Sequence, residues 1–495
     1  MKALLMHPDR DFDVAAAPPA NAADLRQDLE LDTLAGTMCG GDRFLFDVAT
    51  VALLAPLPDP AAIRFRQAVL TDCLEQPAVV RELYELAIAA IQEQRRHWGF
   101  WSESPESILS GSLAALESFV GKLRELRAMA DMHKPEFASE GFNRFFTMLQ
   151  DELSDDYFEL VEGQLETLRF KGGTLISARL GAGNKGIDYV LRLTPELSWR
   201  DRLAQLRRPA LSFTIAERDQ ASLNALSKLN GRSLNHAANA LAQSADHIKS
   251  FFTMLATELA FYIGCLNLHE HLAKLGEPTC LPDPAGPGAP RLSARGLYDV
   301  TLALRLDAAV VGNDADGDGK ALVIVTGANQ GGKSTFLRSL GLAQLMMQSG
   351  MFVPAESFSA DVRDRVFTHY KREEDASMES GKLDEELARM SEIADGLTAN
   401  SMLLCNESFS ATNEREGSEI ARQVSFALTE AGVKVVFVTH LYDFADRVHS
   451  EARADVLFLR APRGDDGQRT FKLLEEAPLP TSYGADTYKQ IFQTR

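Results

Sequence analysis

Residues 327–334 read G-A-N-Q-G-G-K-S and combine closely spaced glycines with a lysine and a hydroxyl group. They fit the pattern G-x-x-x-x-G-K-[ST], in which glycines allow backbone N–H groups to close around phosphate oxygens. An apolar, β-branched run precedes the motif at residues 322–326, and a helical pattern follows it at residues 335–348. Because a helix N-terminus favours anions, this context predicts a loop that binds the phosphates of a nucleotide.

The residues of this loop have separate expected tasks. Lys333 is expected to reach the β- and γ-phosphates of ATP, and the Ser334 hydroxyl is expected to bind Mg²⁺. ATP and Mg²⁺ are therefore the predicted cofactors. Further nucleotide contacts are expected from the rest of the loop and the start of the helix, namely Gly327, Asn329, Gly331, Gly332 and Thr335.

A second apolar strand pattern, residues 402–405, ends in the pair Asn406-Glu407. In P-loop ATPases an acid at such a strand end holds Mg²⁺, and a glutamate after it polarises the attacking water. Asn406 is a neutral amide, and we expect it to contact the nucleotide site and Mg²⁺, directly or through water. Glu407 is the predicted catalytic residue. The alternative is an ordinary strand end.

His440 directly follows the next strand pattern, residues 433–439. A histidine at this place can sense the γ-phosphate, and we assign it a catalytic role. The alternative is a structural histidine, which is the commoner kind. The catalytic assignment therefore depends on the presence of the two other motifs, residues 327–334 and Asn406-Glu407.

The elements that must position these residues change character along the chain. From about residue 31 to residue 272 the pattern is mostly helical, and residues 104–106 (Ser-Pro-Glu) are a typical helix start. Residues 282–290 hold four prolines and two glycines, which excludes a helix and predicts a linker at a domain boundary. Beyond it, continuous apolar runs alternate with helical patterns, as in a buried, largely parallel sheet.

One stretch interrupts the helical part. Residues 174–179 and 188–192 predict two strands around a glycine-rich loop at 181–186. Basic residues are in excess here: five of them face one acid, which gives a local charge of five minus one, or +4. They are Arg169, Lys171, Arg179, Lys185 and Arg192, against Asp188.

The composition limits the number of domains, the cellular compartment and the kind of DNA contact that can be expected. The chain has 495 residues, of which 45% are hydrophobic, enough for about two to four domains. Five cysteines without a C-x-x-C pair are typical of a reduced, cytoplasmic protein. The longest apolar runs, such as residues 48–57, are too short to span a membrane. The formal net charge of −19 means that any DNA contact must come from a local basic surface.

The chain from about residue 31 to residue 491 resembles the MutS family of DNA mismatch-repair ATPases. The resemblance is strongest in the ATPase motifs and extends to the opening of that family's helical core. It is carried by GDRFLFDVATVALLAPLPDPAAIRFRQAVL near the start, TGANQGGKSTFLRSLGLAQLMMQSGMFVPAESF, NSMLLCNESFSATNEREG, FVTHLYDFA and the late Ser482-Tyr483-Gly484.

The resemblance implies a fold and partners. The expected fold is an all-α core and lever with a β-hairpin, clamp-like insertion, followed by an α/β, ABC-like P-loop NTPase domain. The expected limits are an N-terminal segment and helical core at 1–168, the hairpin at 169–195, more helical core at 196–281, the linker at 282–290 and the ATPase domain at 291–495. Members of the family dimerise and share their ATP sites, so a homodimer is expected.

Two further sets of residues take their roles from the resemblance. Met378-Glu379-Ser380-Gly381 occupies the place of the family's signature loop, and Ser380 is the expected contact to the partner's ATP. The hairpin resembles the family's clamp, which grips the DNA backbone, so Lys171, Arg179 and Lys185 are expected DNA contacts. A solvated hairpin whose charges protect its edges is the alternative.

Several departures from the family shape the functional hypothesis. The resemblance places the start of the chain at the helical core, so we expect no mismatch-reading and connector domains, and no Phe-x-Glu wedge occurs in the sequence. We therefore expect an ATPase that couples ATP binding and hydrolysis to dimer closure and DNA clamping, directed by DNA structure rather than by mismatches. The alternative is a nucleotide-gated scaffold that binds a protein partner without DNA.

Overall fold

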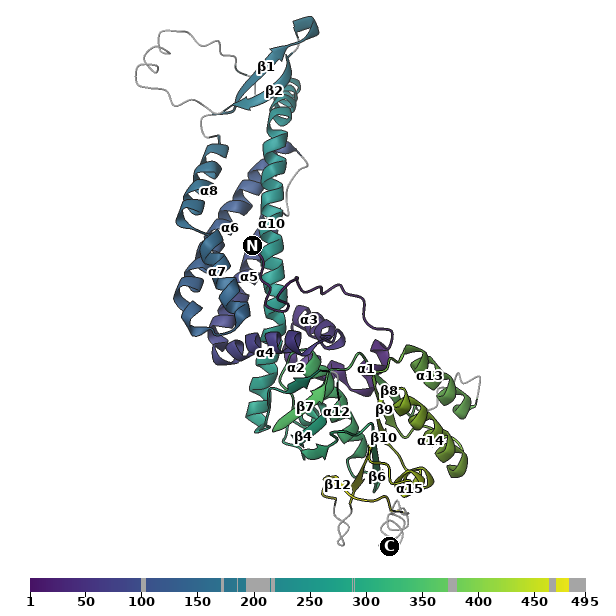
Figure 1. Ribbon diagram of the computed structural model, residues 1–495. Helices are drawn as coiled ribbons and strands as arrows, with labels where there is room; N and C mark the ends of the chain where they lie inside the picture. Colours follow the sequence, from purple (N-terminus) through teal and green to yellow (C-terminus); the bar gives the residue numbers. More distant parts are fainter. Residues whose placement is uncertain are drawn as a thin grey trace, which may run out of the picture. The chain divides into compact units, whose positions relative to one another are not determined.

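The structure is a computed structural model (Figure 1). It describes residues 1–98, 104–170, 173–184, 186–192, 214, 219–286, 288, 290–372, 381–462 and 469–479. Contacts divide the chain into two compact units. Unit 1 holds residues 1–3, 78–137 and 142–256, and unit 2 holds residues 4–77, 138–141 and 257–495.

Unit 1 is a helical body. Its helix α6 starts as predicted, since the Ser104 hydroxyl accepts a hydrogen bond from the Ser107 N–H at 3.2 Å. Phe119 of α6 stacks on Phe252 of the long helix α10, with ring centroids 5.8 Å apart. The elements are α5 (Pro77–Trp98), α6 (Pro105–His133), the 3-10 turn η1 (Lys134–Glu136), α7 (Glu140–Glu152), α8 (Asp155–Leu168) and the first part of α10 (Gln220–Leu275).

The predicted hairpin is present in unit 1. Strands β1 (Leu175–Leu180) and β2 (Gly186–Arg192) pair antiparallel, and the short 3-10 turn η2 (Ala182–Asn184) lies between them. Gly183 in this turn has a φ of 69°, a conformation that favours glycine.

Helix α10 contains a long apolar segment. Leu234–Leu275 has the length and composition of a membrane-crossing helix, with a mean hydropathy of 1.4, but 83% of the window is buried inside the protein. Its apolar residues recur at helical spacing and do not form one unbroken apolar run. Burial on this scale is typical of a core helix.

Unit 2 is built on two sheets in the described part of the chain. The larger has the strand order β12-β11-β6-β10-β9-β8, and its neighbours from β11 to β8 are all parallel, as predicted. The strands are β6 (Leu322–Gly327), β8 (Val366–Tyr370), β9 (Met402–Asn406), β10 (Lys434–Val438), β11 (Val456–Ala461) and the antiparallel edge strand β12 (Leu474–Glu475).

The smaller sheet of unit 2 has the order β3-β7-β4-β5. Its strand β3 (Asp283–Ala285) lies within the proline-rich segment that was expected to be a linker, and pairs with β7 (Ser357–Asp361). The segment is therefore non-helical, as predicted, yet part of a sheet. The two other strands are β4 (Leu292–Leu297) and β5 (Asn313–Asp316).

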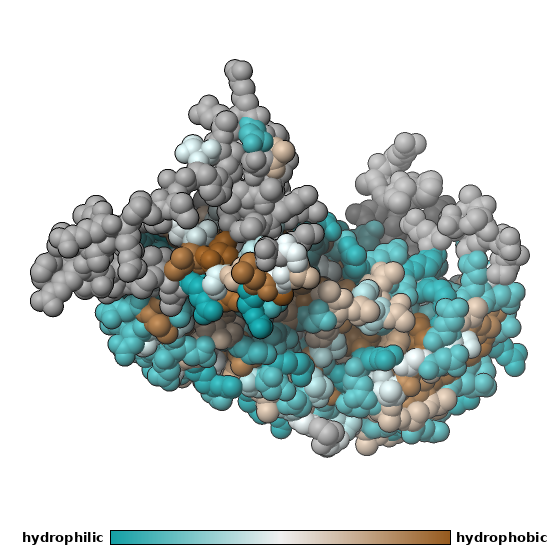
Figure 2. Space-filling model, turned by 90° about the horizontal axis from the view of Figure 1, so that it is seen from above, coloured by the Kyte–Doolittle hydropathy of each residue, from teal (hydrophilic) through white to brown (hydrophobic). Residues whose placement is uncertain are grey.

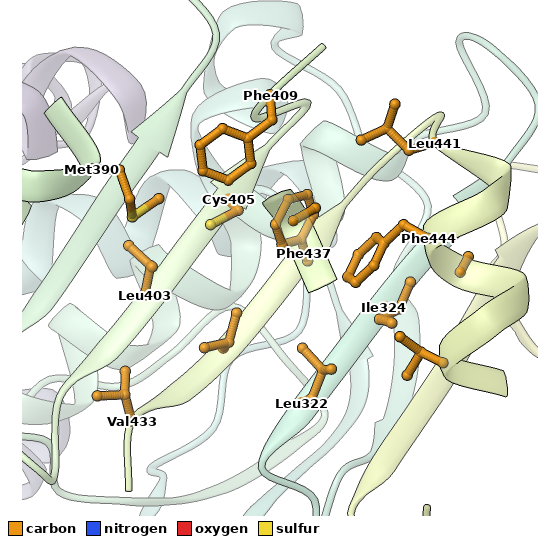
Figure 3. Packing of buried hydrophobic residues seen from close by; sticks show 14 of the residues in the cluster. Leu322, Ile324, Met390, Leu403, Cys405, Phe409, Val433, Phe437, Leu441 and Phe444 are labelled. Carbon is orange, nitrogen blue, oxygen red and sulfur yellow. The ribbon is translucent and has the colours of Figure 1, made fainter. Parts of the chain in front are cut away.

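Helices of unit 2 cover the larger sheet. A core forms where the sheet meets them, and Figure 3 shows Met390, Cys405, Phe409, Phe437 and Phe444 gathered in it. The helices that cover it are α12 (Lys333–Gln348), α13 (Lys382–Gly396), α14 (Glu414–Glu430) and α15 (Tyr442–Ser450), while α11 (Val300–Leu306) contacts α2 and α12.

Four N-terminal helices belong to the same unit as the ATP-binding motifs. Arg338 on α12 forms ion pairs with Glu30 and Asp299, and Arg372 after β8 forms ion pairs with Asp24 and Asp28. This grouping differs from the expected limits, which placed residues 1–168 together, and those limits stay a prediction. The helices are α1 (Ala22–Asp28), α2 (Leu31–Cys39), α3 (Arg43–Leu54) and α4 (Pro60–Glu75).

Candidate functional site

The phosphate-binding motif lies between the end of β6 and the start of α12. Gly327 has a φ of 108°, and a Cβ there would lie 2.4 Å from the Ala461 carbonyl oxygen, so only glycine fits. Gly332 caps α12 with a φ of 92°, and Gln330 adopts a φ of 57°. The loop therefore has the strand–loop–helix geometry that the motif predicts.

Lys333 lies inside the loop. Its Nζ donates to the carbonyl oxygens of Gly327 and Ala328, each at 3.0 Å, and only 5% of the residue is exposed. Burial lowers the pKa of Lys333 to about 8, while the Glu407 carboxylate acts in the opposite direction. An anion in the loop would offset this desolvation by pairing with the ammonium group.

Ser334 and Asn406 meet as their predicted roles require. The Ser334 hydroxyl donates to the Asn406 amide oxygen at 2.9 Å. Oxygen donors of this kind suit Mg²⁺. Among the described residues, no group of three or more His, Cys, Asp and Glu side chains could hold a metal ion, so protein carboxylates do not form a metal cage by themselves.

Glu407 and His440 form a pair at the ends of adjacent strands. Strands β9 and β10 are parallel, and Asn406 lies opposite Val438, which brings the residues after both strands together. The His440 Nε2 and the Glu407 Oε1 are 2.8 Å apart. The hydrogen bond from His440 lowers the pKa of Glu407, against a smaller opposing effect of burial. Glu407 is therefore held as a carboxylate.

These residues line one cavity of about 780 Å³. The predicted residues in its wall are Asn329, Gly331, Gly332, Lys333, Ser334, Thr335, Glu407 and His440. Volume and lining fit a nucleoside triphosphate, since ligand cavities usually measure about 300–1,000 Å³. Asn406 lies next to this cavity, since it accepts a hydrogen bond from Ser334. Gly327 lies at the start of the loop, where its positive φ sets the direction of the backbone.

One side of this cavity is apolar, and the sequence analysis did not predict it. Leu302, Leu306, Val310, Val311 and Phe471 line it, and Leu306 is 60% exposed. Such a surface suits a nucleobase, which offers flat apolar faces. A weak signal was available for α11, because an aspartate before an apolar run is a helix-start pattern; nothing marked Phe471.

Charged residues support that wall from behind. Asp299 caps α11 by accepting from the N–H groups of Thr301 and Leu302, at 3.0 and 3.2 Å. Arg338, one helical turn beyond Ser334, donates to Asp299 at 2.7 Å. The phosphate-binding helix and the apolar wall are thus tied together by a buried ion pair.

The other predicted site residues do not line this cavity in the described part of the chain. Ser380, Lys171 and Lys185 lie outside the described residues. Arg179 is exposed on β1, where its guanidinium lies 3.7 Å from the Asp188 carboxylate. That ion pair engages one of the five basic side chains, with the acid that the local charge of +4 already includes. Figure 2 shows a mostly polar described surface on the face it presents, with apolar patches among the polar residues.

Fold and site together define a P-loop nucleotide-binding domain built on a parallel sheet, attached to a largely helical remainder of the chain. Two family models match the sequence: the MutS2 N-terminal domain over residues 58–275 and MutS domain V over residues 323–492. The chain belongs to the MutS family. The predicted resemblance is thereby confirmed.

Named relatives match part of the chain. The "DNA mismatch repair protein MutS 2" of Haloarcula marismortui is 33% identical over 166 residues, which are 33% of this chain and 18% of that protein. The "DNA mismatch repair protein MutS" of Natronomonas pharaonis is 31% identical over 166 residues, 33% of this chain and 19% of that protein. That of Thermotoga maritima is 36% identical over 127 residues, 26% and 16% respectively. Each match spans less than a fifth of the relative.

Proposed function

We propose that this protein is a DNA-binding ATPase that couples ATP binding and hydrolysis to dimer closure and DNA clamping. The observation that carries the proposal is the single cavity in which the phosphate loop, the Ser334–Asn406 pair and the Glu407–His440 pair converge. Membership of the MutS family supports the DNA-binding part, since the named relatives are DNA mismatch repair proteins.

The proposed reaction is transfer of the γ-phosphoryl group of ATP to water. Backbone N–H groups of the loop and the Lys333 ammonium bind the β- and γ-phosphates. Glu407 accepts a hydrogen bond from the attacking water and orients it for in-line attack. His440 holds the Glu407 carboxylate at 2.8 Å and senses the γ-phosphate from the same position.

The residues present fit a magnesium ion. Ser334 and Asn406 would hold it with the phosphates, because both offer neutral oxygen donors at adjacent positions. The ion supplies neutralisation of charge on the β- and γ-oxygens when bound. Asn406 lacks the negative charge of the usual acid at this position, so we propose that turnover is slow.

The ATP site is proposed to be completed by a second copy of this chain. Segment 378–381 stands at the family's signature position, and Gly381 caps the start of α13, a helix of 15 residues. A helix start with Ser380 before it suits the γ-phosphate of the partner's nucleotide. The proposed assembly is therefore a homodimer with shared ATP sites.

The hairpin is proposed to contact the DNA backbone through Lys171, Arg179 and Lys185, without sequence preference. Binding directed by DNA structure is proposed because no Phe-x-Glu wedge is present in the sequence. A cytoplasmic location is proposed from the five free cysteines and from the burial of the apolar segment of α10.

A second candidate function is a nucleotide-gated scaffold that binds a protein partner without DNA. Two observations favour it: the net charge of −19, and the ion pair that occupies Arg179. Both weaken non-specific attraction to a polyanion.

ATP turnover with single-stranded, duplex and branched DNA separates the two functions. The DNA-binding ATPase predicts measurable turnover that at least one DNA stimulates. The scaffold predicts tight ATP binding with negligible turnover and no effect of any DNA. Absence of both binding and turnover would contradict both.

A further inference from the structure

A buried histidine outside the cavity connects two elements that the proposed mechanism needs. His369 lies on β8, opposite Cys405 of β9, and is fully buried. Its Nδ1 is 2.6 Å from the hydroxyl of Ser408, the residue after Glu407. Its Nε2 is 3.1 Å from the carbonyl oxygen of Glu386, in α13.

The protonation of this ring follows from its partners. A carbonyl oxygen only accepts hydrogen bonds, so Nε2 carries a proton that it donates to Glu386. Burial lowers the pKa of His369 to about 4, which leaves the ring neutral. The Nδ1 of the neutral ring then shares the proton of the Ser408 hydroxyl with the His369 backbone carbonyl oxygen, which lies 2.9 Å from that hydroxyl. His369 thereby has one donor and one acceptor, each engaged with a different element.

The segment that His369 holds is strained. Glu407 has a φ of 55° and Phe409 a φ of 62°, and neither is a glycine. Such conformations are unfavourable for residues other than glycine and persist only where surrounding contacts fix them. The Phe409 ring stacks on His369 with centroids 5.6 Å apart, and the Glu407 N–H donates to the Val438 carbonyl at 2.9 Å.

We propose that His369 is a positioning residue for Glu407, which it fixes relative to α13 through Ser408 and the carbonyl of Glu386. The inference rests on the proposed function, in which Glu407 orients water and the segment before α13 meets the partner's nucleotide. Movement of α13 would reach the catalytic carboxylate through two hydrogen bonds, at a position that no motif marks.

Four variants test the proposal. His369→Leu removes both hydrogen bonds, whereas His369→Gln offers an amide that can donate to Glu386 and accept from Ser408. Ser408→Ala removes the hydroxyl that contacts both the His369 ring and the His369 carbonyl oxygen. His7→Leu is the matched control, because His7 is also buried in unit 2, lies 3.2 Å from an Arg66 nitrogen and does not line the cavity.

The first measurement is single-turnover ATP hydrolysis together with ATP affinity. His369→Leu should lower the hydrolysis rate on the order of 10²-fold, as expected for a misplaced catalytic group, with little change in affinity. Ser408→Ala should lower it by up to about tenfold. His369→Gln should recover most of the parent rate, and His7→Leu should keep it. A parent-like rate in His369→Leu would overturn the proposal.

The second measurement does not depend on turnover. Hydrogen exchange of nucleotide-free protein should be faster over residues 402–413 in His369→Leu and Ser408→Ala than in the parent, with His7→Leu unchanged there. If the parent hydrolyses no ATP, the proposed function fails, but faster exchange would still support the positioning role. Unchanged exchange over 402–413 in both variants would overturn it. Should His369→Leu not fold, Ser408→Ala and His369→Gln carry both measurements.

Discussion

In the nucleotide cavity, the predicted residues that the structure describes lie in a glycine-rich loop, at the start of α12 or just beyond buried parallel strands. In the hairpin, Arg179 and four large apolar residues are exposed to solvent: Leu175, Leu180, Ile187 and Val190. The first region holds its polar groups by hydrogen bonds to the loop and between neighbouring elements, as from Lys333 to Gly327 and from Ser334 to Asn406. In the described part of the second, Arg179 lies 3.7 Å from Asp188 on the paired strand.

The contrast shows what gives a sequence pattern its predictive value. The phosphate-binding motif requires a backbone geometry, and Gly327 has it, with no space for a side chain. An excess of basic residues requires no geometry at all. The charge of the hairpin therefore predicts a function only as far as those charges are free to act.

The largest expected effect concerns Glu407. Glu407→Gln should lower ATP hydrolysis by about 10²–10⁴-fold, because the amide cannot accept the proton of the attacking water. ATP binding should remain, and the ATP-bound dimer should persist. Hydrolysis and equilibrium ATP binding, measured on the same preparation, check both statements. Hydrolysis at the parent rate would show that Glu407 is not catalytic. It would also show that the cavity residues are no better predicted from the sequence than those of the hairpin.

A subunit-mixing experiment has the next largest expected effect. Lys333→Ala and Ser380→Arg subunits should each be nearly inactive alone. Mixed dimers should contain one doubly impaired site and one intact site, so mixing should restore part of the ATPase activity. Full activity of each variant as a monomer, at all concentrations, would show that the site is not shared.

A smaller effect is expected from substitutions in the hairpin, the region where charge alone supports the prediction. The triple variant Lys171→Ala/Arg179→Ala/Lys185→Ala should bind duplex and branched DNA less tightly. Its salt slope should fall by roughly one unit for each lost phosphate contact. Affinity across a salt series measures this, and mismatched duplex should bind no better than matched duplex. An affinity and slope equal to those of the parent would take the hairpin out of the DNA interface.

The smallest effect should come from Asp188→Asn. The substitution releases Arg179 from its ion pair at 3.7 Å and removes one negative charge. Asparagine tolerates the φ of 52° at this position, so the hairpin should keep its shape. DNA affinity should rise a few-fold at low salt, and by less at high salt. Unchanged affinity at low salt would indicate that the pair does not limit DNA binding.

The sequence predicted the polar residues that line the cavity better than its apolar wall. The loop at 327–334, Asn406-Glu407 and His440 each follow a strand pattern, and parallel strands place such residues at one edge. The outcome depends on the order β6-β10-β9, which a single sequence does not determine but which the alternation of strands and helices favours.

Other features could not be predicted for physical reasons. His369 contacts Ser408 and Glu386 only because β8 lies beside β9, and buried histidines have no spacing signal of their own. The ion pairs of Arg338 with Glu30 and of Arg372 with Asp28 join residues more than 300 positions apart. The proline-rich segment excluded a helix correctly, but its pairing with β7 depends on a partner strand about 75 residues later.

The central claim is that the cavity around residues 327–334 binds ATP. The direct test is equilibrium titration of Mg-ATP into the parent, Lys333→Ala and the control Lys320→Ala, whose lysine does not line the cavity. We predict saturable binding to the parent and the control, and on the order of 10²-fold weaker binding to Lys333→Ala with its thermal stability retained. Equal affinity of a folded Lys333→Ala variant and the parent would contradict the account.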